Sequence, residues 1–259
     1  MKNAGLFKAL LGISLVFSLQ ACNLPATTPT PSPGSSPAVP QSPPSASGGG
    51  ACSNPLYPVV KGASWTYSVT GDVSDTFTHS ITDVRADGFT DQDVFTSGVT
   101  RTGEWKCDHG ALIALSPLAG PGAAITANNM TATINTTQMS GLTLPSSVKP
   151  GDTWNQDFAV DGLQSIGGQN VATTGKVAVA CTAGSSEAVT VAAGPFNAQR
   201  VDCKLTLIVT ADIGGLQVPT SFPADTSMWY APAVGLVKLD GAIGGLGGTT
   251  IELTTYSLP

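Results

Sequence analysis

The chain has few basic residues and almost no histidine. Its 259 residues include 11 Lys and Arg against 17 Asp and Glu, and only two histidines, His79 and His109. We do not expect nucleic-acid binding, because neutralising phosphates requires clustered basic groups. The scarcity of histidine argues against hydrolases and metalloenzymes, since histidine is the commonest general base and metal ligand. Aromatic residues make up 6% of the chain, which disfavours stacking platforms for sugars or single strands.

Motifs that carry chemistry are also missing from the sequence. It contains no Cys-x-x-Cys pair, no Gly-x-Ser-x-Gly elbow and no phosphate-binding loop. The glycine-rich run at 241–248 lacks the strand-to-helix context of a dinucleotide site and indicates a hairpin connection instead. We therefore expect no enzymatic activity, no cofactor and no bound metal.

The first 21 residues are typical of an export signal. Lys2 and Lys8 precede an apolar run at 9–19, which is too short to span a membrane. The run ends in Leu19-Gln20-Ala21-Cys22, which resembles the bacterial lipobox and implies cleavage before Cys22 and acylation of that cysteine. Two or three acyl chains would anchor the protein durably to a membrane in the extracytoplasmic cell envelope. The alternative is an ordinary cleaved signal in which Cys22 has no special role.

Residues 22–51 have the composition of a disordered tether. After Cys22 they are almost wholly Pro, Ser, Thr, Ala and Gly, without charge or aromatic rings. Such a segment cannot bury enough apolar surface to offset its ordering entropy. In extended polyproline II form it would span up to roughly 90 Å.

Residues 52–259 predict an all-β domain. Short runs of alternating apolar and polar residues are bounded by Gly, Pro, Asn or Asp, and no segment keeps an apolar helical spacing. We expect an antiparallel sheet that forms an open or half-closed barrel, with a sandwich as the alternative. The predicted strands are 65–70, 76–84, 111–115, 131–136, 171–181, 188–192, 200–211, 228–230, 234–239 and 251–256.

Four cysteines remain after Cys22, an even number that predicts two disulfides in an exported chain. Three pairings are possible. We favour Cys181 with Cys203, because the two strands flanking 188–192 can lie close together, and Cys52 with Cys107, which would fix the start of the domain.

Two clusters of reactive residues have plainer alternatives. Cys107-Asp108-His109, with Glu104, could supply a nucleophile, a base and an orienting group. Adjacent strand residues face opposite sides, however, so a hairpin turn at Asp108-His109-Gly110 and a disulfide at Cys107 are preferred. The acidic stretch could bind calcium, but its spacing fits no known loop, and we expect solvated charge instead. It comprises Asp72, Asp75, Asp83, Asp87, Asp91 and Asp93.

Three segments resemble the signatures of exported bacterial β-barrel domains of the DUF3108-like (TapB-like) group. They are YPVVKGASWTY at 57–67, VAAGPFNAQRV at 191–201 and WYAPAVGLVK at 229–238, and they occur in the group's order. The third is the most specific, although Ala233 stands where Gly is usual. The resemblance implies an open antiparallel barrel in a cell-envelope protein. That group has no established catalytic residues, so none is carried over.

The residues within these segments indicate structural roles. Trp65, Tyr67, Trp229 and Tyr230 are expected to fill the barrel ends, with their polar atoms hydrogen-bonded. Gly194 and Gly235 are expected at turns or bulges with positive φ.

Two functions remain open. In the first, the barrel binds a lipid or another hydrophobic ligand on its inner face. In the second, the protein is a non-enzymatic structural or interaction protein of the cell envelope, and an exported hydrolase is a distant third. The first requires inward apolar positions that leave space, whereas the second requires a filled interior.

Overall fold

The computed structural model describes residues 50–72, 74–117, 122–127, 130–166, 169–213, 216–242 and 248–259. For 122–127, 130–134, 163–166, 169–172, 211–213, 216 and 242 it describes the backbone only. The export signal, Cys22 and nearly all of the predicted tether therefore lie outside the described residues. The domain belongs to a single compact unit that spans 42–259.

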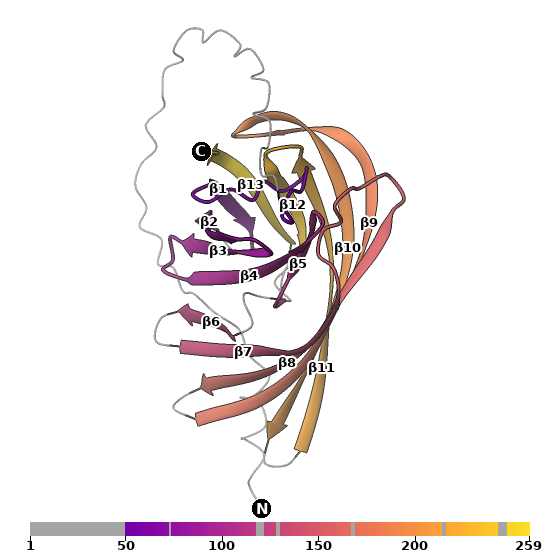
Figure 1. The fold of residues 1–259 in the computed structure, drawn as a ribbon. Coiled ribbons are helices and arrows are strands. Elements are labelled where there is room, and N and C mark those ends of the chain that lie inside the picture. Colours follow the sequence, from indigo (N-terminus) through magenta and orange to yellow (C-terminus); the bar gives the residue numbers. More distant parts are fainter. Residues whose placement is uncertain are drawn as a thin grey trace, which may run out of the picture. The chain divides into compact units, whose positions relative to one another are not determined.

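The described residues form thirteen β-strands that pair in antiparallel fashion (Figure 1). None of them belongs to a helix with the length and apolar character needed to cross a lipid bilayer. The strands are β1 (Ser64–Gly71), β2 (Asp75–Arg85), β3 (Gly88–Phe95), β4 (Thr100–Asp108), β5 (Ala111–Ala114), β6 (Gly122–Ala127), β7 (Met130–Gly141), β8 (Thr153–Ile166), β9 (Gln169–Val191), β10 (Gly194–Ile213), β11 (Leu216–Ala231), β12 (Gly235–Ala242) and β13 (Gly248–Ser257).

The sheet curls into a barrel that is nearly closed. The strand order is β3-β2-β1-β13-β12-β11-β10-β9-β8-β7-β6-β4-β5, and β3 also pairs with β4. The ring is weakest between β4 and β6, where Thr100 and Thr126 form the only paired positions. This confirms the prediction of an antiparallel, half-closed barrel. We call the β4–β6 junction the seam.

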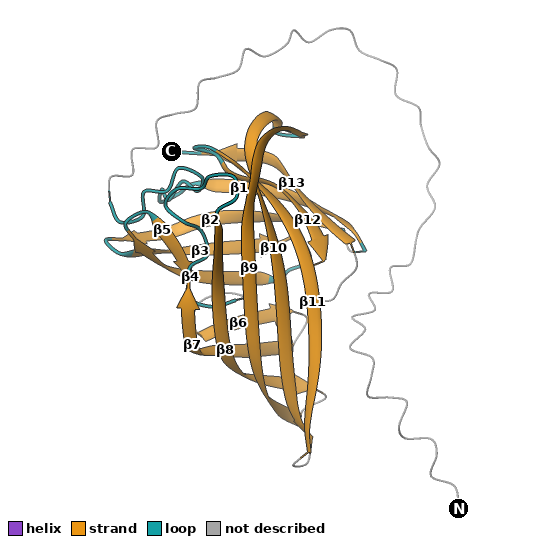
Figure 2. Cartoon of the chain, turned by 90° about the vertical axis from the view of Figure 1, so that its right-hand side faces the viewer, coloured by secondary structure: helices purple, strands orange, loops and turns teal. Residues whose placement is uncertain are grey.

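Strands β8 to β11 are the longest described strands, and β9 and β10 are much longer than the rest (Figure 2). β9 has 23 residues and β10 has 20, whereas β1, β3 and β12 have 8 each. One wall of the barrel therefore extends well beyond the short strands. The inner face of this wall is not matched by an equally long wall among the described strands.

The segment before β1 closes one end of the barrel. Leu56 is buried in the main core, and the side-chain amide of Asn54 donates to the carbonyl oxygens of Gly110 and Pro145, at 2.8 Å each. Leu112 of β5 pairs with Leu144 inside the same end. These contacts fill the interior around the aromatic core of β1–β4.

Several strand predictions were incomplete. β3, β4, β6 and β8 were not predicted, because sequences such as GFTDQDVF and TWNQDFAVDGLQSI carry acidic and amide side chains that weaken the apolar alternation. The run at 188–192 is not a separate strand but the end of β9. Hydrogen bonds to a neighbouring strand on each side stabilise these segments, although their local sequences do not favour strands.

Candidate functional site

A continuous apolar row crosses the inner face of the long wall. Backbone register aligns five side chains from β7 to β11: Met139 with Phe158, Phe158 with Val177, Val177 with Leu207, and Leu207 with Phe222. Side chains on directly opposed strand positions share one face of a sheet. We call these five residues the inner row.

The inward direction of the inner row follows from the alternation along β8. Gln156, two residues before Phe158, donates its side-chain amide to the Ala114 carbonyl oxygen at 2.8 Å, inside the closed end. Phe158 therefore faces inward as well. The charged residues Asp157, Lys176 and Lys204 occupy alternate positions and face outward.

The inner row is only partly covered. Phe158 and Val177 at its middle are buried, whereas Met139 and Phe222 at its two ends are 38% and 37% exposed. Val218, farther along the inward face of β11, is 37% exposed. The long wall thus presents apolar side chains that no described segment covers completely.

A polar row crosses the short strands β1 to β4. Register aligns Trp65 of β1 with His79 of β2, His79 with Asp93 of β3, and Asp93 with Arg101 of β4. Asp93 is 3% exposed and belongs to an otherwise aromatic core. We call these four residues the polar row.

Hydrogen bonds connect the polar row from the core to the seam. His79 Nδ1 lies 2.6 Å from Asp93 Oδ1, and because an ionised carboxylate only accepts, Nδ1 carries the proton. On the other side of the ring, His79 Nε2 lies 2.7 Å from the Tyr57 hydroxyl. Arg101 donates from Nε and from Nη2 to Asp93 Oδ2. The Asp93 carboxylate is thus held from both sides.

Asp91 is a second buried carboxylate beside this row. It accepts a hydrogen bond from Trp105 Nε1 at 2.7 Å, and its Oδ2 lies 3.9 Å from His79 Nε2. Asp91 is paired across the strands with Gly103, where any Cβ would collide with the Asp91 carboxylate. Glycine at 103 therefore makes room for the buried acid.

The pKa values of the two buried carboxyl groups are shifted in opposite directions. Burial raises the pKa of Asp91, and the charge of His79 and the Trp105 hydrogen bond offset this only in part. For Asp93, burial alone would raise the pKa, but the His79 hydrogen bond and the Arg101 charge outweigh it and lower the pKa. Burial also raises the pKa of Tyr57. Compared with free carboxyl groups, Asp93 is thus stabilised in its charged form, and the charged form of Asp91 is disfavoured.

The expectation that the acidic stretch is solvated was wrong for these two residues. Asp91 is 8% exposed and Asp93 3%, because the pleat of β3 turns both toward the core. Asp75 and Asp83 lie at the surface, where Asp83 pairs with Lys61. Among the described residues no cluster of three or more His, Cys, Asp or Glu is arranged to hold a metal ion.

The structure does not bring Cys107, His109 and Glu104 together as a reactive group. Cys107 is bonded to Cys52, and the His109 side chain is 98% exposed. Glu104 instead accepts from Arg85 Nη2 at 2.7 Å. His109 and Gly110 have φ of 48° and 86° and connect β4 to β5, so this segment is the expected hairpin turn.

Two disulfides join the four cysteines of the domain. They are Cys52–Cys107 and Cys181–Cys203, the pairing favoured from the sequence. The reason given for the second was incorrect, however. No strand intervenes: β9 and β10 form one hairpin, in which Cys181 and Cys203 are direct cross-strand partners.

The aromatic residues of the signature segments have hydrogen-bonded polar atoms. Tyr67 donates its hydroxyl to the Leu236 carbonyl oxygen at 2.8 Å, and Tyr230 reaches Met228 Sδ at 3.3 Å. Burial raises the pKa of Tyr230 to about 12. Trp229 Nε1 donates to Glu187, and Trp65 Nε1 to Val234. The N–H or O–H donors of all four side chains thus have hydrogen-bond partners, as expected.

The turns of these segments adopt left-handed backbone conformations. Gly194 and Gly235 have φ of 129° and 106°, as expected from the sequence. Ala233 has φ of 59°. A residue with a Cβ is disfavoured in this conformation, whereas glycine adopts it freely.

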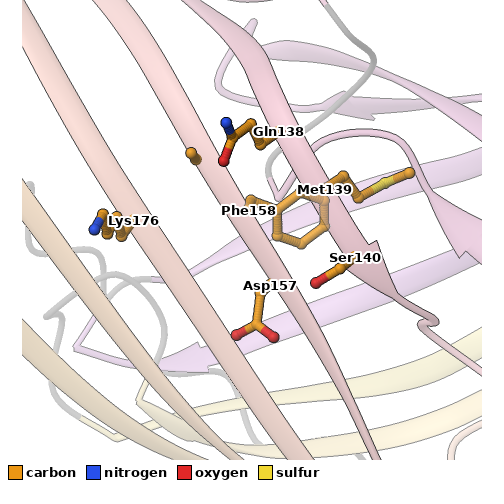
Figure 3. Close-up of a pocket in the computed structure, with 7 residues that line it drawn as sticks. Gln138, Met139, Ser140, Asp157, Phe158 and Lys176 are labelled. Carbon is orange, nitrogen blue, oxygen red and sulfur yellow. The ribbon is translucent and has the colours of Figure 1, made fainter.

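A small hollow of about 270 Å³ lies over β7, β8 and β9 (Figure 3). It is open to solvent, and most of its lining comes from outward positions. Sequence reasoning did not identify it, and it contains no histidine or cysteine. Its lining residues are Gln138, Met139, Ser140, Asp157, Phe158, Ala159 and Lys176.

Comparisons with known proteins identify the fold. No family model and no curated protein sequence matches the chain. A Bacteroides fragilis protein described as exported, with a YmcC-like fold, matches with a TM-score of 0.50 and 12% identity, over 80% of this chain and 100% of that one. A Parabacteroides distasonis protein described as a lipoprotein matches with a TM-score of 0.50 and 14% identity, over 79% and 99% of the two chains. At these identities the likeness concerns architecture, and the chain therefore has the YmcC-like fold.

Proposed function

We propose that this protein binds the apolar chain of a lipid along the inner face of its long wall. The observation that carries the proposal is the inner row, whose end residues Met139 and Phe222 are more than one-third exposed at inward positions. Exposed apolar side chains arranged contiguously are characteristic of binding surfaces. A row of aliphatic and aromatic groups without charge suits an acyl chain.

The matched pair Phe222 and Ile208 tests this proposal. The two residues lie on neighbouring strands and are 37% and 39% exposed, but Phe222 faces inward and Ile208 outward. A charged side chain in the inner row would make an unfavourable contact with the apolar acyl chain. We expect Phe222→Asp to weaken uptake of a fluorescent fatty acid about tenfold or more, equivalent to about 1.4 kcal/mol, and Ile208→Asp to leave it unchanged.

Native mass spectrometry of the purified protein gives an independent readout. A co-purified lipid that the Phe222→Asp variant loses would support the proposal. A protein found only at its own mass, with no uptake of the fatty acid, would overturn it and favour the structural or interaction role in the cell envelope. Neither role requires catalysis.

The proposal includes a location. An export signal at 1–21, acylation at Cys22 and a tether at 22–51 would place the β domain outside the cytoplasm, attached to a membrane from which it could collect a lipid. The lipoprotein description of one structural neighbour and the DUF3108-like (TapB-like) resemblance support this location. Mass analysis of the N-terminal peptide tests it: a diacylated Cys22 is expected, and an unmodified mature N-terminus would contradict it.

A further inference from the structure

Arg101 differs from the other basic residues in where its charge lies. Among the described residues it is the only Lys or Arg that pairs with a carboxylate of the polar row. It occupies an inward position of β4, opposite Asp93, yet its side chain is 44% exposed. A cation at an inward position that remains accessible is unusual in a barrel whose other described inward positions are mostly apolar.

The position of Arg101 next to the seam explains this accessibility. Thr100, the preceding residue, forms the single β4–β6 pair, and the β4–β5 ladder begins only at Trp105. Between these two points β4 has no described strand partner on that side, apart from the hydrogen bond from Leu115 N to the Glu104 carbonyl oxygen. Arg101 thus stands where the barrel wall is least complete.

Described residues hold one edge of the Arg101 guanidinium in place. Nε and Nη2 donate to Asp93, which is itself fixed by His79, while Nη1 makes no hydrogen bond to a described residue. A guanidinium fixed on one edge presents its remaining N–H donors in a defined direction, and such donors suit carboxylate and phosphate oxygens.

We propose that Arg101 binds the acidic head group, a carboxylate or phosphate, of the lipid whose chain lies on the inner face. This inference rests on the proposed function and adds the chemical class of the head group. The seam would give the head group access while the chain follows the long wall. Burial raises the pKa of Asp91, which reduces the negative charge that an anion meets beside Arg101.

The test compares two ligands that differ only in the head group: palmitate and the alcohol of the same chain length. Each displaces a fluorescent apolar probe from the full chain. We expect the protein to prefer palmitate, and Arg101→Gln to reduce that preference about tenfold while leaving alcohol binding unchanged. Arg101→Lys should keep part of the preference, because it retains the charge and loses the planar donor geometry.

A matched control is available on the same sheet. Arg85 is also half-exposed and ion-paired, but it bonds Glu104 and lies away from the polar row. Arg85→Gln should behave as the unmodified protein does. Retained alcohol binding by Arg101→Gln shows that the variant is folded. If Arg101→Gln does not fold, Arg101→Lys provides the test alone. A reduced preference for palmitate supports a specific guanidinium contact, and an unchanged preference contradicts it.

The outcomes separate the two proposals. If neither ligand displaces the probe, the proposed function fails. If both bind equally and Arg101→Gln has no effect, the apolar site stands and the role of Arg101 is wrong. Inorganic phosphate is the third ligand tested. If phosphate, which has no acyl chain, displaces the probe, Arg101 binds a free anion, and the proposal that it binds a lipid head group is wrong.

Discussion

Trp65 in β1 donates its indole Nε1–H to the carbonyl oxygen of Val234 at 2.6 Å, across 169 residues of sequence. Two residues on, Tyr67 makes the equivalent bond to Leu236 over the same separation. The first and third signature segments are therefore in direct contact. The aromatic side chains of the first segment thus satisfy main-chain carbonyls of the third, one in the β11–β12 turn and one at the start of β12.

Removing the Tyr67 hydroxyl should destabilise the domain. Tyr67→Phe leaves the Leu236 carbonyl oxygen without its partner in a buried site, since Tyr67 is 4% exposed. We expect a loss of about 1–2 kcal/mol in the free energy of unfolding, measured by urea denaturation. Tyr256→Phe, at a side chain that is 41% exposed, should change stability little. Equal effects of the two substitutions would contradict this role.

Ala233→Gly should stabilise the protein. Ala233 has φ of 59°, a conformation that costs a residue with a Cβ about 1 kcal/mol and that glycine adopts freely. The same change at Ala178, an exposed strand position, should instead cost about 0.5–1 kcal/mol. Thermal unfolding measures both. An Ala233→Gly variant that melts below the unmodified protein would disprove the strain.

Gly103→Ala should destabilise the protein through Asp91. The added Cβ would overlap the Asp91 carboxylate, which cannot withdraw while Trp105 holds it. We expect a cost of about 1–3 kcal/mol, in the range for overpacking, and a smaller cost when Asp91 is also shortened to serine. Gly248→Ala is the control, because a Cβ there meets no atom within 4 Å. Additive effects of Gly103→Ala and Asp91→Ser would rule out the proposed collision.

Asp91 and Asp93 should give opposite pH dependences. The pKa of Asp93 is lowered on folding, so its contribution to stability is present above the unfolded pKa and is lost as pH falls through the folded pKa. The pKa of Asp91 is raised, so its contribution is present at low pH and is lost as pH rises through the folded pKa.

Asparagine variants separate the two contributions. Relative to the unmodified protein, Asp91→Asn should gain stability as pH rises above the ordinary aspartate pKa of about 4, whereas Asp93→Asn should lose stability as pH rises toward that value from below. Urea midpoints at a series of pH values measure both trends. Parallel curves for all three proteins would show that neither carboxyl has a shifted pKa.

The sequence predicted the fold class and the behaviour of individual residues. Alternating apolar residues indicated an antiparallel β domain, and residues such as Gly235 indicated positive φ, because these properties depend on local conformation. The same applies to the indole N–H of Trp65 and the hydroxyl of Tyr67, which need hydrogen-bond acceptors wherever they are buried. The identity of those partners was not contained in any local pattern.

The register around the barrel was decided by tertiary structure alone. Asp93 and His79 lie 14 residues apart, and their contact depends on how β2 and β3 align, which the hydrogen-bond ladder and its irregularity between Ile81 and Asp83 determine. The inner row likewise requires five strands in register. Alternation along one strand fixes which side chains face inward, but the neighbours they meet depend on the packing of the whole sheet.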